Sequence, residues 1–277
     1  MRFRKIYVEI SNICSLSCRF CPGTGRAPGR MSAERFAVLL PRLRPYTDYL
    51  YFHVMGEPLC HPELERLLTL AGQAGFRVIL TTNGTLLDRH GEMLLANPGL
   101  YKVNISLHAF EANDLSMPFE QYLDHCFAFG RAAAGKKLVV YRLWNQGGED
   151  ARNADILSRM KSHFTGEWVE EQKGTRIDQR VYLEYGEKFD WPDLRSGETG
   201  GRFNCRALRD QLGVLWDGTV IPCCLDHEGD LALGNLFEQE LEEILSAPRA
   251  RSIASGFARG EAVEELCKRC GYAMRFM

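Results

Sequence analysis

Apolar residues along the first two thirds of the chain follow two alternating patterns. Short runs rich in valine, isoleucine, leucine and tyrosine are typical of buried β-strands. The longer segments between them carry apolar residues three and four positions apart, as amphipathic helices do. Ser32 followed by Glu34, and Pro62 followed by Glu63, are typical helix starts. We predict strands at about 4–10, 48–54, 76–81, 101–107, 137–143 and 180–186, and helices at about 32–43, 62–74, 88–96, 118–134 and 153–163.

The connections between the predicted strands are long and contain helices. Such connections join parallel strands, whereas hairpins join antiparallel ones. Regular alternation of strand and helix with right-handed crossovers builds either a doubly wound sheet or a barrel. Six strand–helix units are too few for a complete eight-fold barrel. The pattern therefore predicts one α/β domain over residues 1–190 and does not choose between the two architectures.

The last third of the chain has a different composition. Residues 187–204 are rich in glycine and are typical of a linker. The tetrapeptide 216–219 (Trp-Asp-Gly-Thr) is typical of a hairpin turn between two short strands. Residues 236–247 and 261–269 have helical patterns. We therefore predict a second, smaller unit over residues 191–277, which includes most of the linker.

Composition and charge exclude several classes of protein. The chain of 277 residues has a formal net charge of −2 with both signs interspersed, so we expect neither nucleic acid nor an anionic membrane as a partner. Residues 1–10 lack the apolar core of a signal peptide, and no run approaches the roughly 18 apolar residues of a membrane span. The ten cysteines are then more typical of metal ligands than of disulfides, and we expect a cytoplasmic protein.

Three cysteines lie close together just after the first predicted strand. Cys14, Cys18 and Cys21 have the spacing C-x-x-x-C-x-x-C. Iron–sulfur clusters normally have four cysteine ligands, so three thiolates would leave one iron of a [4Fe–4S] cluster open for chemistry. A zinc knuckle and a redox C-x-x-C pair are the alternatives, but zinc sites usually contain two C-x-x-C pairs. The spacing favours the open cluster.

This spacing resembles the signature of the radical S-adenosylmethionine (radical SAM) superfamily. Phe20 stands before the third cysteine, where that family usually has an aromatic residue. The resemblance implies a partial (β/α)6 barrel with S-adenosylmethionine bound to the open iron. It also implies that one electron cleaves S-adenosylmethionine to methionine and a 5′-deoxyadenosyl radical, which takes a hydrogen atom from the substrate. A low-potential partner, a flavodoxin or ferredoxin, would supply that electron.

The resemblance also implies contacts to S-adenosylmethionine at the carboxyl ends of the strands, where barrels gather their reactive groups. Met55-Gly56-Glu57 before Pro58 is similar to the family's Gly-Gly-Glu-Pro motif, whose backbone binds the amino group of the cofactor, with Met55 in place of the first glycine. An arginine suits the cofactor carboxylate because a guanidinium matches its shape and charge. The alternatives are a plain turn for the Gly-Glu-Pro segment, an ordinary strand serine for Ser106 and an ion pair at the barrel rim for Arg142. The residues implied in cofactor binding are Phe20, Met55, Gly56, Glu57, Asn83, Ser106 and Arg142.

A second cysteine set follows the linker. Cys205 and Cys223 have the pattern C-x12-G-x4-C, and Cys267 and Cys270 form a C-x-x-C pair. Four thiolates from two separated pairs close a complete metal site. The pattern resembles the auxiliary-cluster domain called SPASM or, in its shorter form, twitch. The resemblance implies one auxiliary [4Fe–4S] cluster, because only seven residues follow Cys270; a structural zinc ion is the alternative.

The three remaining cysteines and three of the histidines have open roles. Cys224 follows Cys223 directly, and neighbours on a strand point to opposite faces, so we do not expect it to be a ligand. Cys126 has the pattern of a small buried hydrophobe. Cys60 lies near the predicted active face and would return a hydrogen atom to a substrate radical if the product were an epimer. His53, His61 and His108 are candidate acid–base groups, and the sequence does not choose among them.

A fully ligated auxiliary cluster has no open iron for substrate, so its expected roles are electron transfer and structural support. If the substrate loses a hydrogen atom, a proton and an electron, the net reaction is a two-electron oxidation. The chain would then be an oxidoreductase or maturase acting on a small molecule or a peptide residue. The cysteine arrangement is similar to that of a twitch-domain dehydrogenase that oxidises a secondary alcohol. The alternatives are redox-neutral epimerisation, crosslinking or cyclisation, and a metal-binding or electron-transfer protein without catalysis. The sequence does not predict the substrate.

Overall fold

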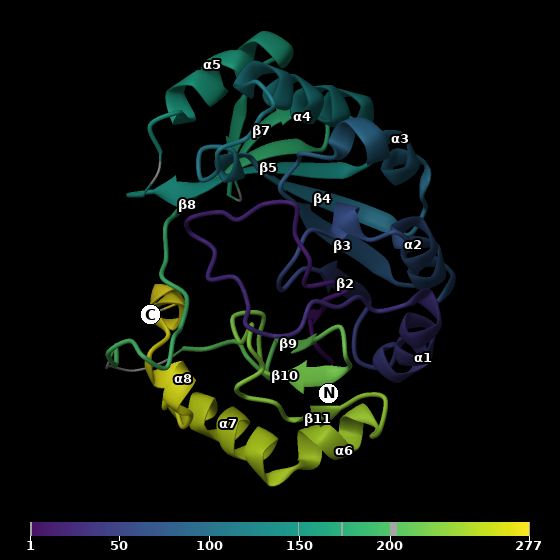
Figure 1. The fold of residues 1–277 in the computed structure, drawn as a ribbon, viewed down its shortest axis with the longest axis vertical. Coiled ribbons are helices and arrows are strands. Elements are labelled where there is room, and N and C mark those ends of the chain that lie inside the picture. Colours follow the sequence, from purple (N-terminus) through teal and green to yellow (C-terminus); the bar gives the residue numbers. More distant parts are fainter. Residues whose placement is uncertain (1, 149, 173, 200–203, 277) are drawn as a thin grey trace.

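A single curved sheet runs through the described part of the chain, which comprises residues 2–148, 150–172, 174–199 and 204–276 of this computed structural model (Figure 1). The strand order is β11-β10-β9-β1-β2-β3-β4-β5-β8-β7-β6. The strands are β1 (Lys5–Val8), β2 (Tyr49–Phe52), β3 (Arg77–Thr82), β4 (Leu100–Ser106), β5 (Leu138–Gln146), β6 (Val169–Glu171), β7 (Gly174–Asp178), β8 (Val181–Glu187), β9 (Gln211–Val214), β10 (Thr219–Ile221) and β11 (Gly234–Asn235). The helices are α1 (Ala33–Leu43), α2 (Leu64–Gln73), α3 (Leu87–Ala96), α4 (Phe119–Ala133), α5 (Asn153–His163), α6 (Leu241–Ser246), α7 (Pro248–Arg259) and α8 (Glu265–Lys268), with short 3-10 helices η1 (Pro58–Cys60), η2 (Leu107–Ala109) and η3 (Gly271–Phe276).

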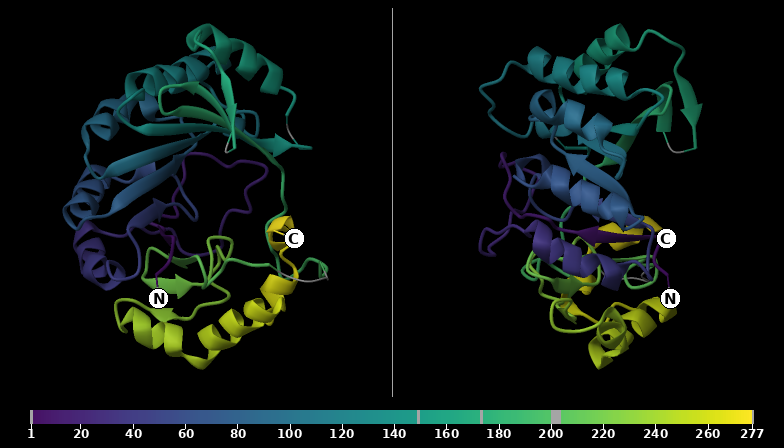
Figure 2. Two further views of the ribbon diagram at one scale, coloured as in Figure 1. Left: turned by 180° about the vertical axis from the view of Figure 1, so that it is seen from behind. Right: turned by 90° about the vertical axis from the view of Figure 1, so that its right-hand side faces the viewer.

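The first five strands and β8 are parallel and form an open barrel. Neighbouring strands in this part pair in parallel from β1 to β5, and β5 pairs in parallel with β8. Helices α1 to α5 cover the outer face of the sheet (Figures 1 and 2). The observed elements confirm the strands and helices predicted for this half of the chain and the α/β fold class.

Side chains of the barrel strands alternate between the hydrophobic core and the barrel interior. In β1, Ile6 belongs to the core, whereas Lys5 and Tyr7 line an interior cavity. In β5, Tyr141 belongs to the core and Arg142 lines the cavity. Because successive strand residues point to opposite faces, the same strands supply both an apolar core and a partly polar interior.

Helix α1 shows how the local pattern produces an element that packs on the sheet. Ser32 is its N-cap, and the Ser32 hydroxyl accepts a hydrogen bond from the Arg35 N–H at 3.3 Å. Phe36, Leu39 and Leu43 lie three or four positions apart and are fully buried. The helix therefore starts where its predicted cap lies and buries the face that its periodicity defines.

Both ends of the sheet contain pairings that the sequence pattern did not predict. Strands β6 and β7 form an antiparallel hairpin between α5 and β8, and β7 pairs with β8. At the other end, β9 and β10 form the predicted antiparallel hairpin. Strand β9 also pairs in parallel with β1, from Lys5 opposite Gln211 to Val8 opposite Val214. The barrel sheet therefore continues into the C-terminal unit.

The C-terminal helices differ from the prediction. The helix expected at 236–247 is shortened to α6, the one expected at 261–269 is shortened to α8, and α7 between them was not predicted. Ala247 has extended backbone (ψ 149°), so α6 ends there, and Pro248 opens α7 because proline suits the first helical turn. Gly260, with φ 79°, ends α7 in the left-handed conformation that favours glycine.

Residues 200–203 of the predicted linker lie outside the described residues. In the ranges that the structure describes, no helix combines the length and the apolar character that crossing a membrane requires.

Candidate active site

The first three predicted metal ligands lie on the segment between β1 and α1, which we call the cysteine loop (residues 11–31). The Asn113 side-chain amide donates a hydrogen bond to the Cys18 sulfur at 3.1 Å. The Cys21 N–H donates to the Cys18 carbonyl oxygen at 2.9 Å. Burial raises the pKa of Cys14 to about 11 and also raises the pKa values of Cys18 and Cys21. The three thiols thus share a partly desolvated environment.

This donor set fits an iron–sulfur cluster held by three thiolates. Bound metal deprotonates cysteine ligands, and N–H groups such as that of Asn113 stabilise ligand sulfur by hydrogen bonding. Sequence reasoning missed Asn113, which lies 95 positions from Cys18 and has no motif around it. Across the described ranges, no three His, Cys, Asp or Glu side chains form a group that could hold a metal ion by themselves.

The turn after β2 contacts the backbone of the cysteine loop. Gly56 has φ +79°, and a Cβ added there would lie 2.3 Å from the carbonyl oxygen of Ser11, so only glycine allows this approach. The Glu57 N–H donates to the Ile13 carbonyl oxygen at 2.9 Å. Met55, beside them, is buried. The Met-Gly-Glu segment therefore positions the loop that carries the cysteines.

The buried Glu57 side chain joins the ends of β2 and β3. Its carboxylate accepts hydrogen bonds from the Thr82 hydroxyl at 2.8 Å, the Asn83 N–H at 2.7 Å and the Leu59 N–H at 3.0 Å. Burial raises the pKa of Glu57 to about 7, and the three hydrogen bonds oppose that shift. The Asn83 side-chain amide donates to the Ser15 hydroxyl at 3.2 Å. The two strand ends and the cysteine loop therefore form one hydrogen-bonded unit.

A cavity of about 420 Å³ lies between the barrel strands and the C-terminal unit. Its wall includes residues of the strands β1 to β5, of the cysteine loop and of the second cysteine set. Of the residues that the family resemblance implies in cofactor binding, Phe20, Ser106 and Arg142 line the cavity. The other four, Met55, Gly56, Glu57 and Asn83, lie at the cysteine loop and are not among the described residues that line the cavity.

Arg142 projects from β5 into this cavity. Its Nε lies 3.6 Å from a Glu184 carboxylate oxygen, and its guanidinium stacks 4.2 Å from the centre of the Trp144 ring. Burial lowers the pKa of Arg142, and the Glu184 charge opposes that shift. The Nε is buried without a hydrogen-bond partner among the described residues. Arg142 therefore keeps donor capacity inside the cavity.

The four cysteines of the second set come together, as their spacing predicted. Cys205, Cys223, Cys267 and Cys270 line one small pocket whose other walls include apolar side chains such as Leu266. Burial raises the pKa of Cys223, and the neighbouring thiols raise it further. Four thiols match the number and kind of ligands that a closed [4Fe–4S] cluster takes, and a structural zinc ion takes the same four. Cys205, Cys223 and Cys270 line the 420 Å³ cavity as well.

The structure distinguishes the two cysteines near the active face. Cys60 lies in η1 and is not among the described residues that line the cavity. Cys224 does line it, beside Tyr7 and Lys5. Burial raises the pKa of Cys224, while the Tyr7 hydroxyl and the Lys5 charge oppose that shift. Of Cys60 and Cys224, Cys224 is therefore the one that lines the cavity. Cys126 is fully buried in the core, as predicted.

The three candidate histidines have different surroundings. The two ring nitrogens of His61 lie 3.1 Å from the Met31 carbonyl oxygen and from the Glu63 N–H, and His61 does not line the cavity. His108 lines the cavity, but its Nδ1 lies 3.1 Å from the Arg142 carbonyl oxygen. His53 also lines the cavity, and its ring has no hydrogen-bond partner among the described residues. His53 alone of the three presents both ring nitrogens without a protein partner.

A cysteine loop whose Phe20 lines an interior cavity, and a second cysteine set of which Cys205, Cys223 and Cys270 line the same cavity, define an α/β-barrel protein equipped for iron–sulfur chemistry. The chain matches the model of the radical SAM superfamily over residues 8–129 and that of the SPASM iron–sulfur cluster-binding domain over residues 205–271. It belongs to the radical SAM superfamily and has a C-terminal SPASM domain. Its cofactors are accordingly a [4Fe–4S] cluster, S-adenosylmethionine and, in the SPASM domain, auxiliary iron–sulfur clusters.

Relatives and solved structures of this class span nearly the whole chain. The S-adenosyl-L-methionine-dependent 2-deoxy-scyllo-inosamine dehydrogenase of Niallia circulans is 21% identical over 276 residues, which cover 97% of this chain and 92% of the dehydrogenase. The structure of BtrN in complex with AdoMet and 2-DOIA has a TM-score of 0.64 at 18% identity and covers 98% of this chain and 94% of that chain. Streptococcus suis SuiB bound to the precursor peptide SuiA has a TM-score of 0.65 at 16% identity, covering 100% and 73%. The two structures confirm the fold.

Proposed function

We propose that this chain is a radical SAM oxidoreductase that removes two electrons from a hydroxyl-bearing carbon of a small molecule. The observation that carries the proposal is the shared cavity, because Phe20 of the cysteine loop and Cys223 of the second cysteine set face the same space. A volume of about 420 Å³ suits a small molecule. When bound, the clusters and S-adenosylmethionine supply the hydrogen-abstracting radical and an acceptor for one electron.

The reaction balances as an alcohol oxidation. The substrate carbon loses a hydrogen atom, which ends in 5′-deoxyadenosine, and the hydroxyl loses a proton to a base. One electron would pass to the auxiliary cluster and from there to the oxidised form of the flavodoxin or ferredoxin, and a carbonyl product would remain. A flavodoxin or ferredoxin supplies the electron that cleaves S-adenosylmethionine. The whole-length similarity to a dehydrogenase from Niallia circulans supports this reading over the peptide-directed ones.

The proposed ligands of the metal clusters and of S-adenosylmethionine are residues of the cysteine loop, the SPASM domain and the cavity wall. Cys14, Cys18 and Cys21 hold the open cluster on the cysteine loop, and the four gathered cysteines of the SPASM domain hold one auxiliary [4Fe–4S] cluster. Arg142 binds the carboxylate of S-adenosylmethionine through the donor capacity described above. Phe20 and Ser106 line the same cavity and contact the cofactor.

His53 receives the substrate proton in this proposal. Burial, together with the charges of Arg142 and Lys5, lowers the pKa of His53 to about 4. The imidazole is therefore neutral at physiological pH and has a nitrogen free to accept a proton. Its ring lies near Tyr7, with the ring centres 6.2 Å apart.

The direct test is a hydrogen-tracing assay on the reconstituted protein with S-adenosylmethionine and dithionite. The candidate substrates are 2-deoxy-scyllo-inosamine and related polyols that carry deuterium on their hydroxyl-bearing carbons. The proposal expects deuterium in 5′-deoxyadenosine and a ketone product in equal amounts. A polyol that transfers deuterium and returns as an epimer, without a ketone, would show that the chemistry is redox-neutral.

Replacing His53 by glutamine is expected to lower ketone formation by about 100-fold, because a positioned base contributes roughly 10²–10⁴-fold. Glutamine fills similar space but does not accept a proton at neutral pH. Slow cleavage of S-adenosylmethionine without substrate should be unchanged. His90→Gln on α3, a histidine not among the described residues lining the cavity, is the matched control. Equal ketone yields from the two variants would remove His53 from the mechanism.

A redox-neutral reaction is the second candidate, and the placement of Cys224 favours it. A thiol in the cavity would give its hydrogen atom to the substrate radical, and the resulting thiyl radical would return to the thiol by taking an electron from the low-potential donor and a proton from solvent. Cys224 now takes the donor role first considered for Cys60, because Cys224 lines the cavity whereas Cys60 is not among the described residues that line it.

Replacing Cys224 by serine separates the two candidates. If the enzyme oxidises its substrate to a ketone, the variant should keep most of its ketone formation, because it retains the shape of the side chain and all four proposed ligands of the auxiliary cluster. If the enzyme is an epimerase, the Cys224→Ser variant should form no product that carries solvent deuterium, although it should still produce 5′-deoxyadenosine. Mass spectrometry of the product in deuterated buffer measures the difference, and Cys60→Ser serves as the control.

A further inference from the structure

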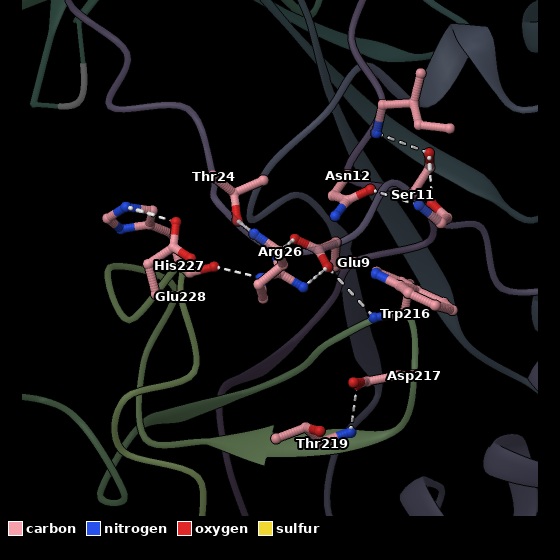
Figure 3. A network of polar contacts seen from close by, with 12 residues as sticks. Glu9, Ser11, Asn12, Thr24, Arg26, Trp216, Asp217, Thr219, His227 and Glu228 are labelled. Atoms are coloured by element: carbon pink, nitrogen blue, oxygen red, sulfur yellow. Dashed lines mark hydrogen bonds and ion pairs between the residues drawn. The ribbon is translucent and has the colours of Figure 1, made fainter.

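A buried ion pair lies between the cysteine loop and the SPASM domain (Figure 3). Glu9, just after β1, has a fully buried side chain, and the side chain of Arg26 is 15% exposed. Two guanidinium nitrogens of Arg26 donate to the two carboxylate oxygens of Glu9 at 2.8 and 2.6 Å. Such a two-point contact fixes orientation as well as distance.

The same pair binds the SPASM domain directly. The third guanidinium nitrogen of Arg26 donates to the His227 carbonyl oxygen at 2.8 Å. The Trp216 N–H donates to the Glu9 carboxylate at 3.3 Å. The Gly25 N–H donates to a carboxylate oxygen of Glu228 at 2.9 Å. Glu9 and Arg26 are thus shared between the two halves of the molecule, as the dashed contacts in Figure 3 show.

Besides these hydrogen bonds, the cysteine loop and the SPASM domain make a close apolar contact. A Cβ added to Gly29 of the cysteine loop would lie 2.3 Å from the Trp216 ring, so the ring rests directly on the loop backbone. Along the chain, Glu9 precedes Cys14 and Arg26 follows Cys21, while Trp216 and His227 stand on either side of Cys223. The contacts therefore connect the two segments that carry the proposed metal ligands.

We propose that the Glu9–Arg26 pair is a positioning clamp that holds the cysteine loop and the SPASM segment 214–229 in one fixed arrangement, and so sets the separation of the two iron–sulfur sites. Glu9 and Arg26 are not among the described residues that line the 420 Å³ cavity. The inference uses the proposed ligand assignment but does not depend on which reaction the cavity performs.

The chemistry of the pair explains why these two residue types are used. Burial raises the pKa of Glu9, and the charge and hydrogen bonds of Arg26 oppose that shift. Removing one partner leaves an uncompensated buried group, which is far more disruptive than losing a surface pair. Lysine would keep the charge but would lose the planar fork that reaches Glu9 and His227 together.

The test compares Arg26→Gln and Arg26→Lys with the control Arg66→Gln, which removes an exposed ion pair to Glu34. Hydrogen–deuterium exchange is measured on the protein before cluster loading. In Arg26→Gln we expect exchange to accelerate about tenfold in both 11–31 and 214–229, with a smaller change in Arg26→Lys. The control should match the wild type. Acceleration of 11–31 alone, or of neither segment, would overturn the clamp.

A second readout uses the holoprotein with both clusters reduced by dithionite. Spin–spin interaction between the clusters reports their separation, and each cluster's own EPR spectrum reports its integrity. In Arg26→Lys and Arg26→Gln we expect a weakened or broadened interaction while iron content and both individual spectra stay unchanged. An unchanged interaction would refute the positioning role. If the wild type showed only one cluster, the ligand assignment would fail, and the exchange data would still decide the clamp.

Discussion

Replacement of Cys14, Cys18 and Cys21 together by alanine is expected to abolish cleavage of S-adenosylmethionine. Without these thiolates the cysteine loop offers no ligands for an iron that binds the cofactor, so no electron reaches the sulfonium. The measurement is 5′-deoxyadenosine formed under dithionite after anaerobic reconstitution. We expect a fall below about 1% of the wild-type rate, because the reaction has no route other than the cluster.

Iron content supplies the control for this variant. The wild type should bind about eight irons and the variant about four, since one of two four-iron sites is removed. S-adenosylmethionine should change the EPR signal of the reduced wild type and leave that of the variant unaltered. Wild-type protein with about four irons, and a variant with none, would mean that the SPASM cysteines hold zinc or no metal. The electron-acceptor role would then be withdrawn.

Replacement of Cys205 and Cys223 by alanine is expected to have a different outcome. Both cysteines lie in the small pocket with the C-x-x-C pair, so losing them removes half of the proposed ligands of the auxiliary site. Cleavage of S-adenosylmethionine should persist at a reduced rate, whereas ketone formation should fall below detection because the second electron has no acceptor. The ratio of ketone to 5′-deoxyadenosine measures this uncoupling.

Cys126→Ala is the matched control for that experiment. Cys126 is a buried core cysteine and does not line either pocket among the described residues, so its loss reports the general effect of removing a thiol. The control should keep the wild-type ratio of the two products. If the Cys205/Cys223 variant folded, bound about four irons and still made ketone at that ratio, the auxiliary cluster would have no part in oxidation.

The barrel half was predictable because its elements are set by local patterns. The Ser32 cap and the three- and four-residue spacing of α1 are visible in the sequence, and both are realised in the structure. Strands β6 and β7 were missed because β6 has three residues and both are partly exposed, so no apolar run marks them. The pairing of β9 with β1 was missed because it joins residues about two hundred positions apart.

The candidate site divides in the same way. Cysteine spacing predicted two groups of candidate ligands, because a metal site selects residue type and separation together. The choice between Cys60 and Cys224 depends on which way each side chain points once the sheet has formed, and the sequence does not contain that information in readable form. Arg26 of the cysteine loop pairs with Glu9, which lies just after β1, but no periodicity or motif distinguishes Arg26 from the other arginines of the chain.

The pairing of β9 with β1 has a practical consequence for dissecting this protein. A cut near residue 190 follows the predicted domain boundary, but it removes strand β9, which pairs with the outer edge of β1. The exposed edge would present unpaired amide and carbonyl groups next to a row of apolar side chains, and such edges recruit other chains. The radical SAM half on its own is therefore a poor candidate for a soluble fragment, and the two halves are best produced and studied as one chain.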